Sequence, residues 1–349
     1  MPHSYRIQLK PLPGFEWSSL TGNVASAAAY VGSDYMYAFA DAWSFSCLKE
    51  QASSGFAALG QESVLYNTSY EQILDWSRID YRVSNYLPAE EALALIRLEL
   101  AQKRPVLVKG DSFYCGWFPE NYGQQHSSNF YLITGYDDLT HQLFCTDVAY
   151  MTHHYPQSVS DFSLGFAGEL MTMWPTHDQY RPIVQQPSLD EILVRSAERN
   201  LAQKQEACPM FESMLQLANK LPELDRLAVE QQQHDGPGSM NRLSLELLYI
   251  VQSRMQFVRL LDKLCVEQNQ AMCQLVEGFA QSVRSWSLIR SAYLHTFEPR
   301  SSRERILDSM ATEIHVTAAL EREISQSIMH IRRLQHVSDR FQQRMLGES

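Results

Sequence analysis

The sequence predicts an α+β protein in two parts, a mixed domain with a small antiparallel sheet over residues 1–180 and an all-helical domain over residues 181–349. Strand-like runs of β-branched, aromatic and aliphatic residues, bounded by Gly, Asp and Asn, occupy positions 106–108, 130–133 and 143–145. The last two runs are joined by a short connection with turn residues, which is typical of an antiparallel pair. From residue 188 onward Leu, Met, Gln, Glu and Arg dominate, and apolar residues recur at helical spacing.

Local patterns predict the other elements of the N-terminal domain. An Ala-rich run from Ser18 or Ser19 to Tyr30, followed by Gly32, predicts a helix that packs closely on more than one side. Residues 88–102 predict an amphipathic helix with Pro88 near its start and two acidic residues in its first turn. The remaining expectations are an edge strand over 5–12, a helix then a strand over 34–48, a short helix over 70–76, a loop-rich stretch over 151–178 and a linker over 179–187.

The C-terminal domain is predicted to be a helical bundle. Ser188 and Glu191 have the spacing of a capping box, which opens a helix. We expect a second helix over 209–221, a third that continues to 233, and a break in the Gly- and Pro-containing stretch that follows. The apolar stripes over 243–286 and 306–341 predict two long helices. Unbroken, each would be about 60–80 Å long, so we expect at least one break.

Composition and charge exclude several classes of function. The formal net charge of −11, from 40 acidic and 29 basic residues, argues against nucleic acid as the main partner, because phosphate binding needs clustered Lys and Arg. The six cysteines form no Cys-x-x-Cys pair and no zinc-type array, so we expect no metal site and a reducing, cytoplasmic environment. His153 and His154 could be metal ligands, but the sequence offers no third ligand at a spacing typical of metal sites. The N-terminus has no apolar segment of the kind found in signal peptides, so we expect no signal peptide. The sequence has no apolar run long enough for a membrane span, so we expect none.

Three polar positions accompany the predicted helix and sheet. Ser19 lies thirteen residues before Gly32, Asn129 opens the strand that leads to Gly135-Tyr136-Asp137, and Asp147 ends the next strand. Over about residues 10–180 this order resembles the N-terminal domain of the butirosin-biosynthesis H family, whose members are papain-like, C39-like relatives of the cysteine proteases. The resemblance implies a papain-like fold and the transfer, cyclisation or release of an acyl thioester in bacterial peptide or polyketide biosynthesis. It implies no cofactor beyond the phosphopantetheine of an acyl or peptidyl carrier protein, with a small molecule as acyl acceptor.

The residues that match the family's catalytic triad differ from it in chemistry. The family's Cys, His and third polar group correspond here to Ser19, Asn129 and Asp147, with Ser18 as an alternative for the Cys position. An unactivated Ser is a poor nucleophile and Asn cannot accept its proton, and general-base help is typically worth about 10²–10⁴-fold in rate. If catalysis is retained, Ser19 acts as nucleophile or orienting group, Asn129 as a donor to the substrate oxyanion, and Asp147 as base or orienting group. Each residue also has a purely structural alternative: Ser19 as a helix cap, Asn129 as a strand-entry residue and Asp147 as a turn former.

Other residues offer alternative sites. Cys115 and His126 are an alternative catalytic pair in the loop before Asn129. Glu16 and Trp17, next to the proposed nucleophile, are candidates to line an acyl or amine pocket, although a Trp that packs under the loop is the more ordinary arrangement. The helical domain carries scattered basic residues that are candidates to dock an acidic carrier protein or to pair with nearby Glu: Arg300, Arg303, Arg305, Arg332, Arg333 and Arg340.

Three hypotheses of different classes follow. The first is an acyltransferase-like enzyme that acts on a carrier-bound acyl thioester. The second is a non-catalytic papain-like relative that binds an acyl chain or a carrier protein as an accessory subunit. The third is a helical dimerisation module with a vestigial N-terminal domain, which forms a homodimer through its C-terminal helices.

Overall fold

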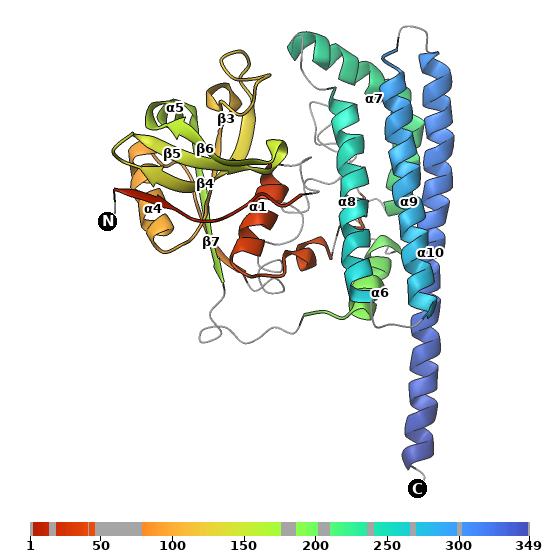
Figure 1. Cartoon of the computed structure of the whole chain (residues 1–349). Helices are drawn as coiled ribbons and strands as arrows, with labels where there is room; N and C mark the ends of the chain where they lie inside the picture. The colour runs from red at the N-terminus through yellow and green to blue at the C-terminus, as the bar shows by residue number, and fades with distance from the viewer. Residues whose placement is uncertain are drawn as a thin grey trace. The chain divides into compact units, whose positions relative to one another are not determined.

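The protein is described by a computed structural model that covers residues 3–13, 19–40, 42–45, 79–175, 186–201, 210–235, 241–265, 270–298 and 302–347. The chain divides into two compact units (Figure 1). The sheet unit comprises Met1–Ala38 and Ser69–Gln185, and the helical unit comprises Phe39–Thr68 and Gln186–Ser349. The α+β class expected from the sequence is therefore confirmed. Residues 39–45 belong with the helices, which a single division at residue 180 did not anticipate.

The sheet unit is built on an antiparallel sheet with the strand order β2-β7-β3-β4-β5-β6, in which β1 also pairs with β4. The strands are β1 Ser4–Arg6, β2 Ile79–Ser84, β3 Val106–Asp111, β4 Ser128–Asp137, β5 Gln142–Asp147, β6 Thr152–Ser158 and β7 Phe166–Pro175. The three strands read from the sequence are confirmed as β3, β4 and β5, each longer than its apolar run. β4 is buried along most of its length, which places it at the centre of this unit.

Two short strands share one edge of β4. The pairing of β3 with β4 ends at Ile133, and β1 continues along β4 from Gly135. The close approach of β1 requires a glycine, because a Cβ at position 135 would lie 2.6 Å from the carbonyl oxygen of Tyr5. The expected edge strand over 5–12 is correct in kind but shorter than predicted.

Among its described residues, the sheet unit also contains three helices. They are α1 Ser19–Tyr30, α4 Ala89–Ala101 and α5 Val159–Gly165. α1 packs on β4 and α4 packs on β7 and β4. The bounds of both agree with the sequence patterns, and Gly32 after α1 has the positive φ of +78° expected of a helix stop. Buried Ala25, Ala27 and Ala28 allow α1 to lie close to its neighbours.

Several expectations for this part of the chain were wrong. The stretch 151–178 was expected to be rich in loops, yet it holds β6, α5 and β7. Residues 79–84 were not recognised as a strand. They form β2 by pairing with β7, which lies far away in the sequence, so no local pattern indicates this strand. In the described part of 34–48, residues Tyr35–Phe39 form a 3-10 turn and residues 42–45 form no strand, while residues 41 and 46–48 lie outside the described residues. The helix expected over 70–76 and most of the expected linker lie outside the described residues.

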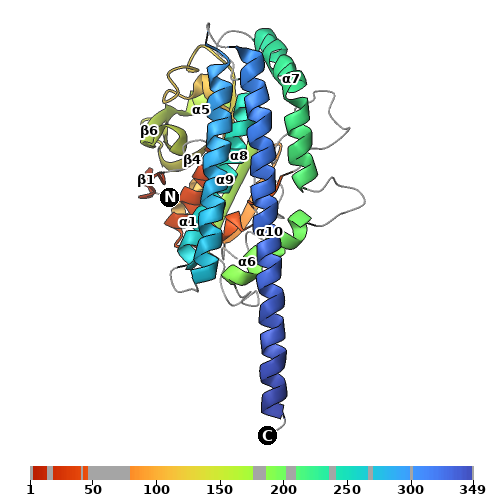
Figure 2. The same ribbon diagram turned by 90° about the vertical axis from the view of Figure 1, so that its right-hand side faces the viewer.

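The helical unit is a bundle of α6 Leu189–Leu201, α7 Met210–Asp235, α8 Arg242–Cys265, α9 Gln270–His295 and α10 Arg303–Gly347. Figure 2 shows α7, α9 and α10 running alongside one another, with the C-terminal part of α10 extending beyond them. The capping box is confirmed, since Ser188 N–H donates to Glu191 Oε2 at 2.7 Å and Glu191 N–H donates to Ser188 Oγ at 3.3 Å.

One of the two long apolar stripes is divided between two helices, whereas the other forms a single helix. The stripe over 243–286 is divided between α8 and α9, as expected of a helix that length. The stripe over 306–341 forms one helix of 45 residues, about 68 Å long at 1.5 Å per residue, because no Gly or Pro interrupts it before Gly347. Residues 210–235 likewise form one helix rather than two, with exposed Pro222 inside it. Among the described residues, no helix is long and apolar enough to cross a membrane.

Candidate functional site

Ser19 is the first residue of α1, and its hydroxyl lies against β4. The backbone N–H of Phe130 donates to Ser19 Oγ at 3.4 Å, so this hydroxyl lies next to the strand position that follows Asn129. The side chain is half-buried. The N-terminus of a helix carries a partial positive charge from its unpaired N–H groups, and this charge favours an anion there.

Asp147 lies at the end of β5 and is fully buried, with 0% of its surface exposed. Its Oδ2 accepts hydrogen bonds from Asn129 Nδ2 at 2.9 Å and from Trp117 Nε1 at 3.0 Å. Its Oδ1 accepts from the backbone N–H of Ala149 at 3.0 Å and from Asn23 Nδ2 at 3.2 Å. Burial raises the pKa of Asp147 above its usual value, and the four hydrogen bonds oppose that rise. All four partners are donors, so they fit an ionised carboxylate.

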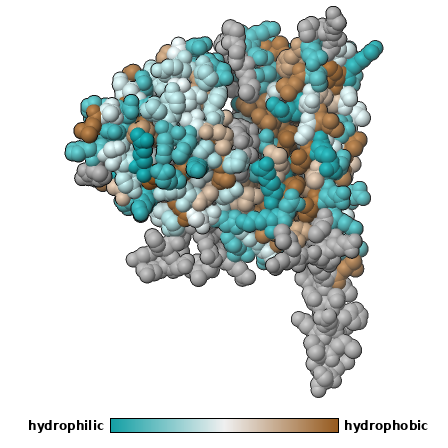
Figure 3. All heavy atoms as spheres, in the orientation of Figure 1, coloured by the Kyte–Doolittle hydropathy of each residue, from teal (hydrophilic) through white to brown (hydrophobic). Residues whose placement is uncertain are grey.

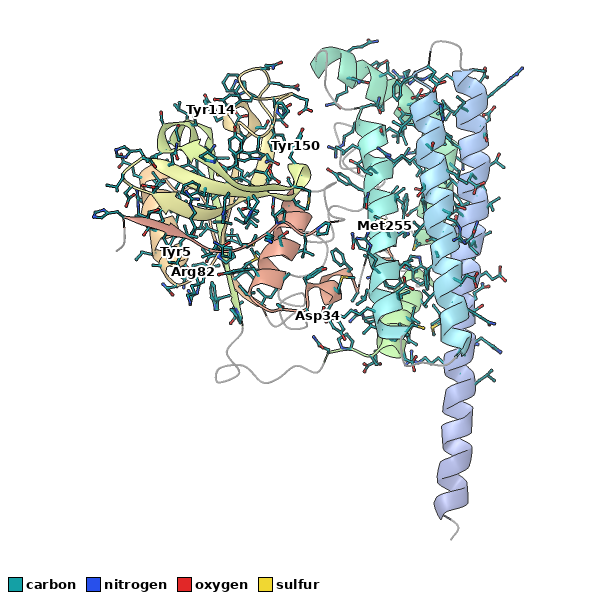
Figure 4. All side chains as sticks on the ribbon, in the orientation of Figure 1. Tyr5, Asp34, Arg82, Tyr114, Tyr150 and Met255 are labelled. Atoms are coloured by element: carbon teal, nitrogen blue, oxygen red, sulfur yellow. The ribbon has the colours of Figure 1, made fainter. Side chains whose placement is uncertain are left out.

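Asn23 joins α1 to both strands of the site. It lies one turn after Ser19 and is fully buried. Besides its bond to Asp147, its Nδ2 donates to the carbonyl oxygen of Phe130 at 2.9 Å, and its Oδ1 accepts from the N–H of Val148 at 3.1 Å. These contacts fix α1 against β4 and against the 3-10 turn Val148–Tyr150, whose last residue is labelled in Figure 4.

The structure therefore joins Asn129 and Asp147 in one hydrogen-bonded network and places Ser19 beside it, in contact with the backbone of the next residue of β4. We name Ser19, Asn23, Trp117, Asn129 and Asp147 the α1–β5 network. Sequence reasoning missed Asn23 and Trp117. A lone Asn in an Ala-rich helix was the available signal for Asn23, whereas the role of Trp117 depends on how its loop folds.

The α1–β5 network lacks a group that could deprotonate Ser19. The amide nitrogen of Asn129 donates its proton to Asp147 and has no basic lone pair. Each oxygen of Asp147 already accepts two hydrogen bonds. Within the part of the chain that the structure describes, the hydrogen-bond partner of Ser19 Oγ is the N–H of Phe130, which is a donor. The arrangement can position and donate hydrogen bonds, but it offers Ser19 no proton acceptor.

The alternative pair, Cys115 and His126, is not joined. Cys115 is fully buried, its thiol donates to the carbonyl oxygen of Asp111 at 3.5 Å, and burial together with nearby carboxylates raises its pKa. A neutral buried thiol is a poor nucleophile. His126 is instead bonded through Nδ1 to Asp111 Oδ2 at 2.5 Å and stacks on Phe113, with 66% of its side chain exposed. No hydrogen bond links it to Cys115.

Those of the remaining candidates that the structure describes form no assembled site. Glu16 and Trp17 lie outside the described residues. His153 and His154 stack on each other, and His154 Nε2 lies 2.8 Å from the carbonyl oxygen of Ile7. The described residues contain no group of three or more His, Cys, Asp or Glu side chains that could hold a metal ion. Arg303 pairs with Asp225 and Arg332 pairs with Glu198, so these two cations are matched within the helical unit.

Comparison with known proteins gives no independent assignment. No model of a known protein family matches the chain, and no curated protein is similar to it. The interpretation of the site therefore depends on its own residues and geometry.

Proposed function

We propose that the sheet unit is a papain-like domain that has kept the framework of the catalytic site but not its acid–base chemistry, and that it serves as an accessory subunit. In this proposal it binds an acyl chain or an acyl or peptidyl carrier protein in a bacterial peptide or polyketide pathway. The observation that carries the proposal is the closed hydrogen bonding of Asp147, whose four partners are all donors.

The framework supports the papain-like part of this proposal. A helix begins at Ser19 beside the strand that Asn129 enters, and the next strand ends at Asp147. In a papain-like site these positions hold the nucleophile, the base and the group that orients the base. Here the middle position is an amide, and its bond to Asp147 resembles the bond that would orient a His.

The loss of chemistry follows from the same contacts. A base must have a free lone pair within hydrogen-bond reach of the proton that it removes. Asn129 has none on its nitrogen. Asp147 is fully buried, and each of its oxygens accepts two hydrogen bonds, one of them from Asn129. Among the described residues, Ser19 therefore lacks general-base help, which is typically worth about 10²–10⁴-fold in rate. A buried, satisfied polar network of this kind rigidifies a fold, which suits a recognition domain.

A second candidate function, acyl transfer through Ser19, is favoured by one observation. Ser19 opens α1, where the partial positive charge of the helix favours an oxyanion. In this version the Ser19 oxygen attacks the thioester carbonyl, the carbon–sulfur bond breaks, and the departing pantetheine thiolate takes the hydroxyl proton. An amine or alcohol acceptor then displaces Ser19 from the acyl ester and returns the proton to it. The second N–H of Asn129 is available to the oxyanion.

Intact-protein mass spectrometry separates the two functions. Wild type, Ser19→Ala and Cys115→Ala are each incubated with acyl-pantetheine thioesters of several chain lengths, and binding of the same thioesters and of acylated carrier protein is measured by calorimetry. The proposal predicts no covalent adduct on any variant together with measurable binding. An adduct lost only in Ser19→Ala would establish the acyltransferase instead, and an adduct lost only in Cys115→Ala would establish a thiol site. If no variant forms an adduct and no binding is measured, both functions are contradicted.

A further inference from the structure

A short N-terminal segment is built into the interior of the helical unit. Residues 42–45 belong to the helical unit although they precede most of the sheet unit in the sequence, and Trp43 is fully buried with 0% exposure. The indole meets the edge of Phe279 at a centroid distance of 4.4 Å and lies 5.9 Å from Phe257. Phe45 stacks on Trp286 at 5.9 Å. Two consecutive odd-numbered side chains of this segment thus occupy aromatic sites formed by α8 and α9.

The indole N–H of Trp43 has a charged partner at the base of its site. Trp43 Nε1 donates to Glu321 Oε2 at 2.9 Å, across 278 residues of sequence. Glu321 lies on α10 and is itself 0% exposed. An indole N–H is only a donor, so a buried carboxylate is a specific complement to it.

The carboxylate of Glu321 is held by the helices themselves. Arg254 of α8 approaches it through Nε at 3.2 Å and Nη2 at 3.3 Å. From α9, Trp286 Nε1 donates to Oε1 at 3.1 Å, and the hydroxyl of Ser282 donates to the same oxygen. These four contacts do not involve the segment. The helices therefore fix the acceptor in place whether or not Trp43 occupies the site.

The helices also bind the backbone of the segment. Arg254 Nη1 donates to the carbonyl oxygen of Ser44 at 2.6 Å and to that of Ala42 at 3.4 Å. The carbonyl oxygen of Trp43 accepts from Asn200 Nδ2 at 3.0 Å and from Arg199 Nη2 at 2.8 Å. Consecutive carbonyls are thus matched by side-chain donors of α6 and α8, in the way that a receptor recognises an extended peptide.

We propose that the helical unit contains a preformed indole-binding site, and that residues 42–45 are its internal ligand. The site consists of Phe257 and Phe279 as walls, Glu321 as the acceptor for the indole N–H, and Arg254 and Asn200 as donors to the peptide backbone. The class of ligand is an extended peptide segment that carries a Trp, or the free indole ring itself. The helical unit is complete only when this segment is docked, so a chain that begins at residue 186 lacks part of its own core.

Chemical rescue in the full-length protein tests the proposal. Trp43→Ala is expected to lower the unfolding midpoint of the helical unit by about 10 °C, because removal of a buried Trp leaves a large cavity. Indole is expected to raise that midpoint in a saturable, concentration-dependent way. 1-Methylindole, which has the same ring but no N–H donor, is expected to give less than about one fifth of the shift. The wild type with indole is the matched control and is expected not to shift, because its site is filled.

Every outcome bears on the proposal. If Trp43→Ala is too unstable to purify, expression with indole in the medium is expected to restore the folded yield, and failure to do so overturns the proposal. An equal response to indole and 1-methylindole would overturn the role of Glu321. An unchanged midpoint in Trp43→Ala, or no response to indole, would show that no preformed site exists. Trp43→Phe provides a second test, since it keeps an aromatic ring and is expected to be rescued less by indole than Trp43→Ala.

Discussion

The substitution Asp147→Asn tests the α1–β5 network most sharply, because it keeps the shape of the side chain while removing its negative charge and replacing one acceptor oxygen with a donor NH2 group. Each carboxylate oxygen of Asp147 faces two donors. An Asn at this position must place its own NH2 group opposite one of these pairs, whichever way the amide is turned. Two buried donors then lose their acceptor, and each costs about 1–3 kcal/mol. We expect Asp147→Asn to destabilise the sheet unit by about 2–6 kcal/mol.

Native-state hydrogen exchange is the appropriate assay, because peptides from β4 and β5 report the stability of the sheet unit alone. Asp138→Asn is the matched control. It makes the same chemical change in the same unit, but Asp138 is 36% exposed and its partner Arg97 is 31% exposed, so a loss below about 1 kcal/mol is expected. Equal effects of the two substitutions would refute the view that Asp147 is saturated by buried donors.

Three further predictions follow from other parts of the structure. Burial raises the pKa of Glu246 from 4.5 to about 7, so the folded state holds a proton that the unfolded state has lost, and stability of the helical unit falls as pH rises between these values. At about 1.4 kcal/mol per pKa unit the loss of stability is about 3 kcal/mol. Urea unfolding at pH 5 and pH 8 is expected to show this loss in wild type but not in Glu246→Gln. An identical pH dependence of the two proteins would contradict the prediction. Gly135→Ala is expected to destabilise the pairing of β1 with β4 by about 1–3 kcal/mol, because the new Cβ would lie 2.6 Å from the carbonyl oxygen of Tyr5; unchanged exchange at residues 4–6 would argue against this. Cys115 is expected to resist a thiol reagent in the native protein at least about 100-fold more than in urea, since it is buried and neutral; rapid native labelling would reopen the thiol site.

The local sequence was enough to predict those elements whose start, end and buried face are all indicated by their own residues. The Ala-rich α1 ends at a Gly with positive φ, and α4 has an acidic first turn and one buried face. Such signals do not depend on the rest of the chain. The strands β3, β4 and β5 were recognisable for the same reason, as apolar runs bounded by turn residues.

The elements that were missed depend on distant partners. β7 contains Gly168 and two methionines, and it is held as a strand by β2 and β3 on its two sides. Trp43 shows no local sign of its place, because its acceptor Glu321 lies 278 residues away. Tertiary pairing overrides local propensity at such positions.

The candidate site was reached through a motif and completed by the structure. The order of Ser19, Asn129 and Asp147 along the chain identified three members of the α1–β5 network. Asn23 and Trp117 could not be assigned from sequence, since their donors meet Asp147 only after α1 and the loop after β3 have packed. The hydropathy of the surface gives no comparable signal for this site, because the hydrophobic residues on the face drawn in Figure 3 lie mostly over the helical unit.

The central claim is that Ser19, Asn129 and Asp147 occupy the positions of a papain-like triad. Restoring the family's side chains tests it directly, with Ser19→Cys alone as the control for Ser19→Cys/Asn129→His. Alkylation of the introduced thiol by iodoacetamide is followed against pH by mass spectrometry of the peptide that contains position 19. An imidazole oriented by Asp147 beside a helix N-terminus should lower the thiol pKa by about two units or more, so the double variant is expected to react at least about tenfold faster at pH 6. Equal rates in two folded variants would contradict the claim.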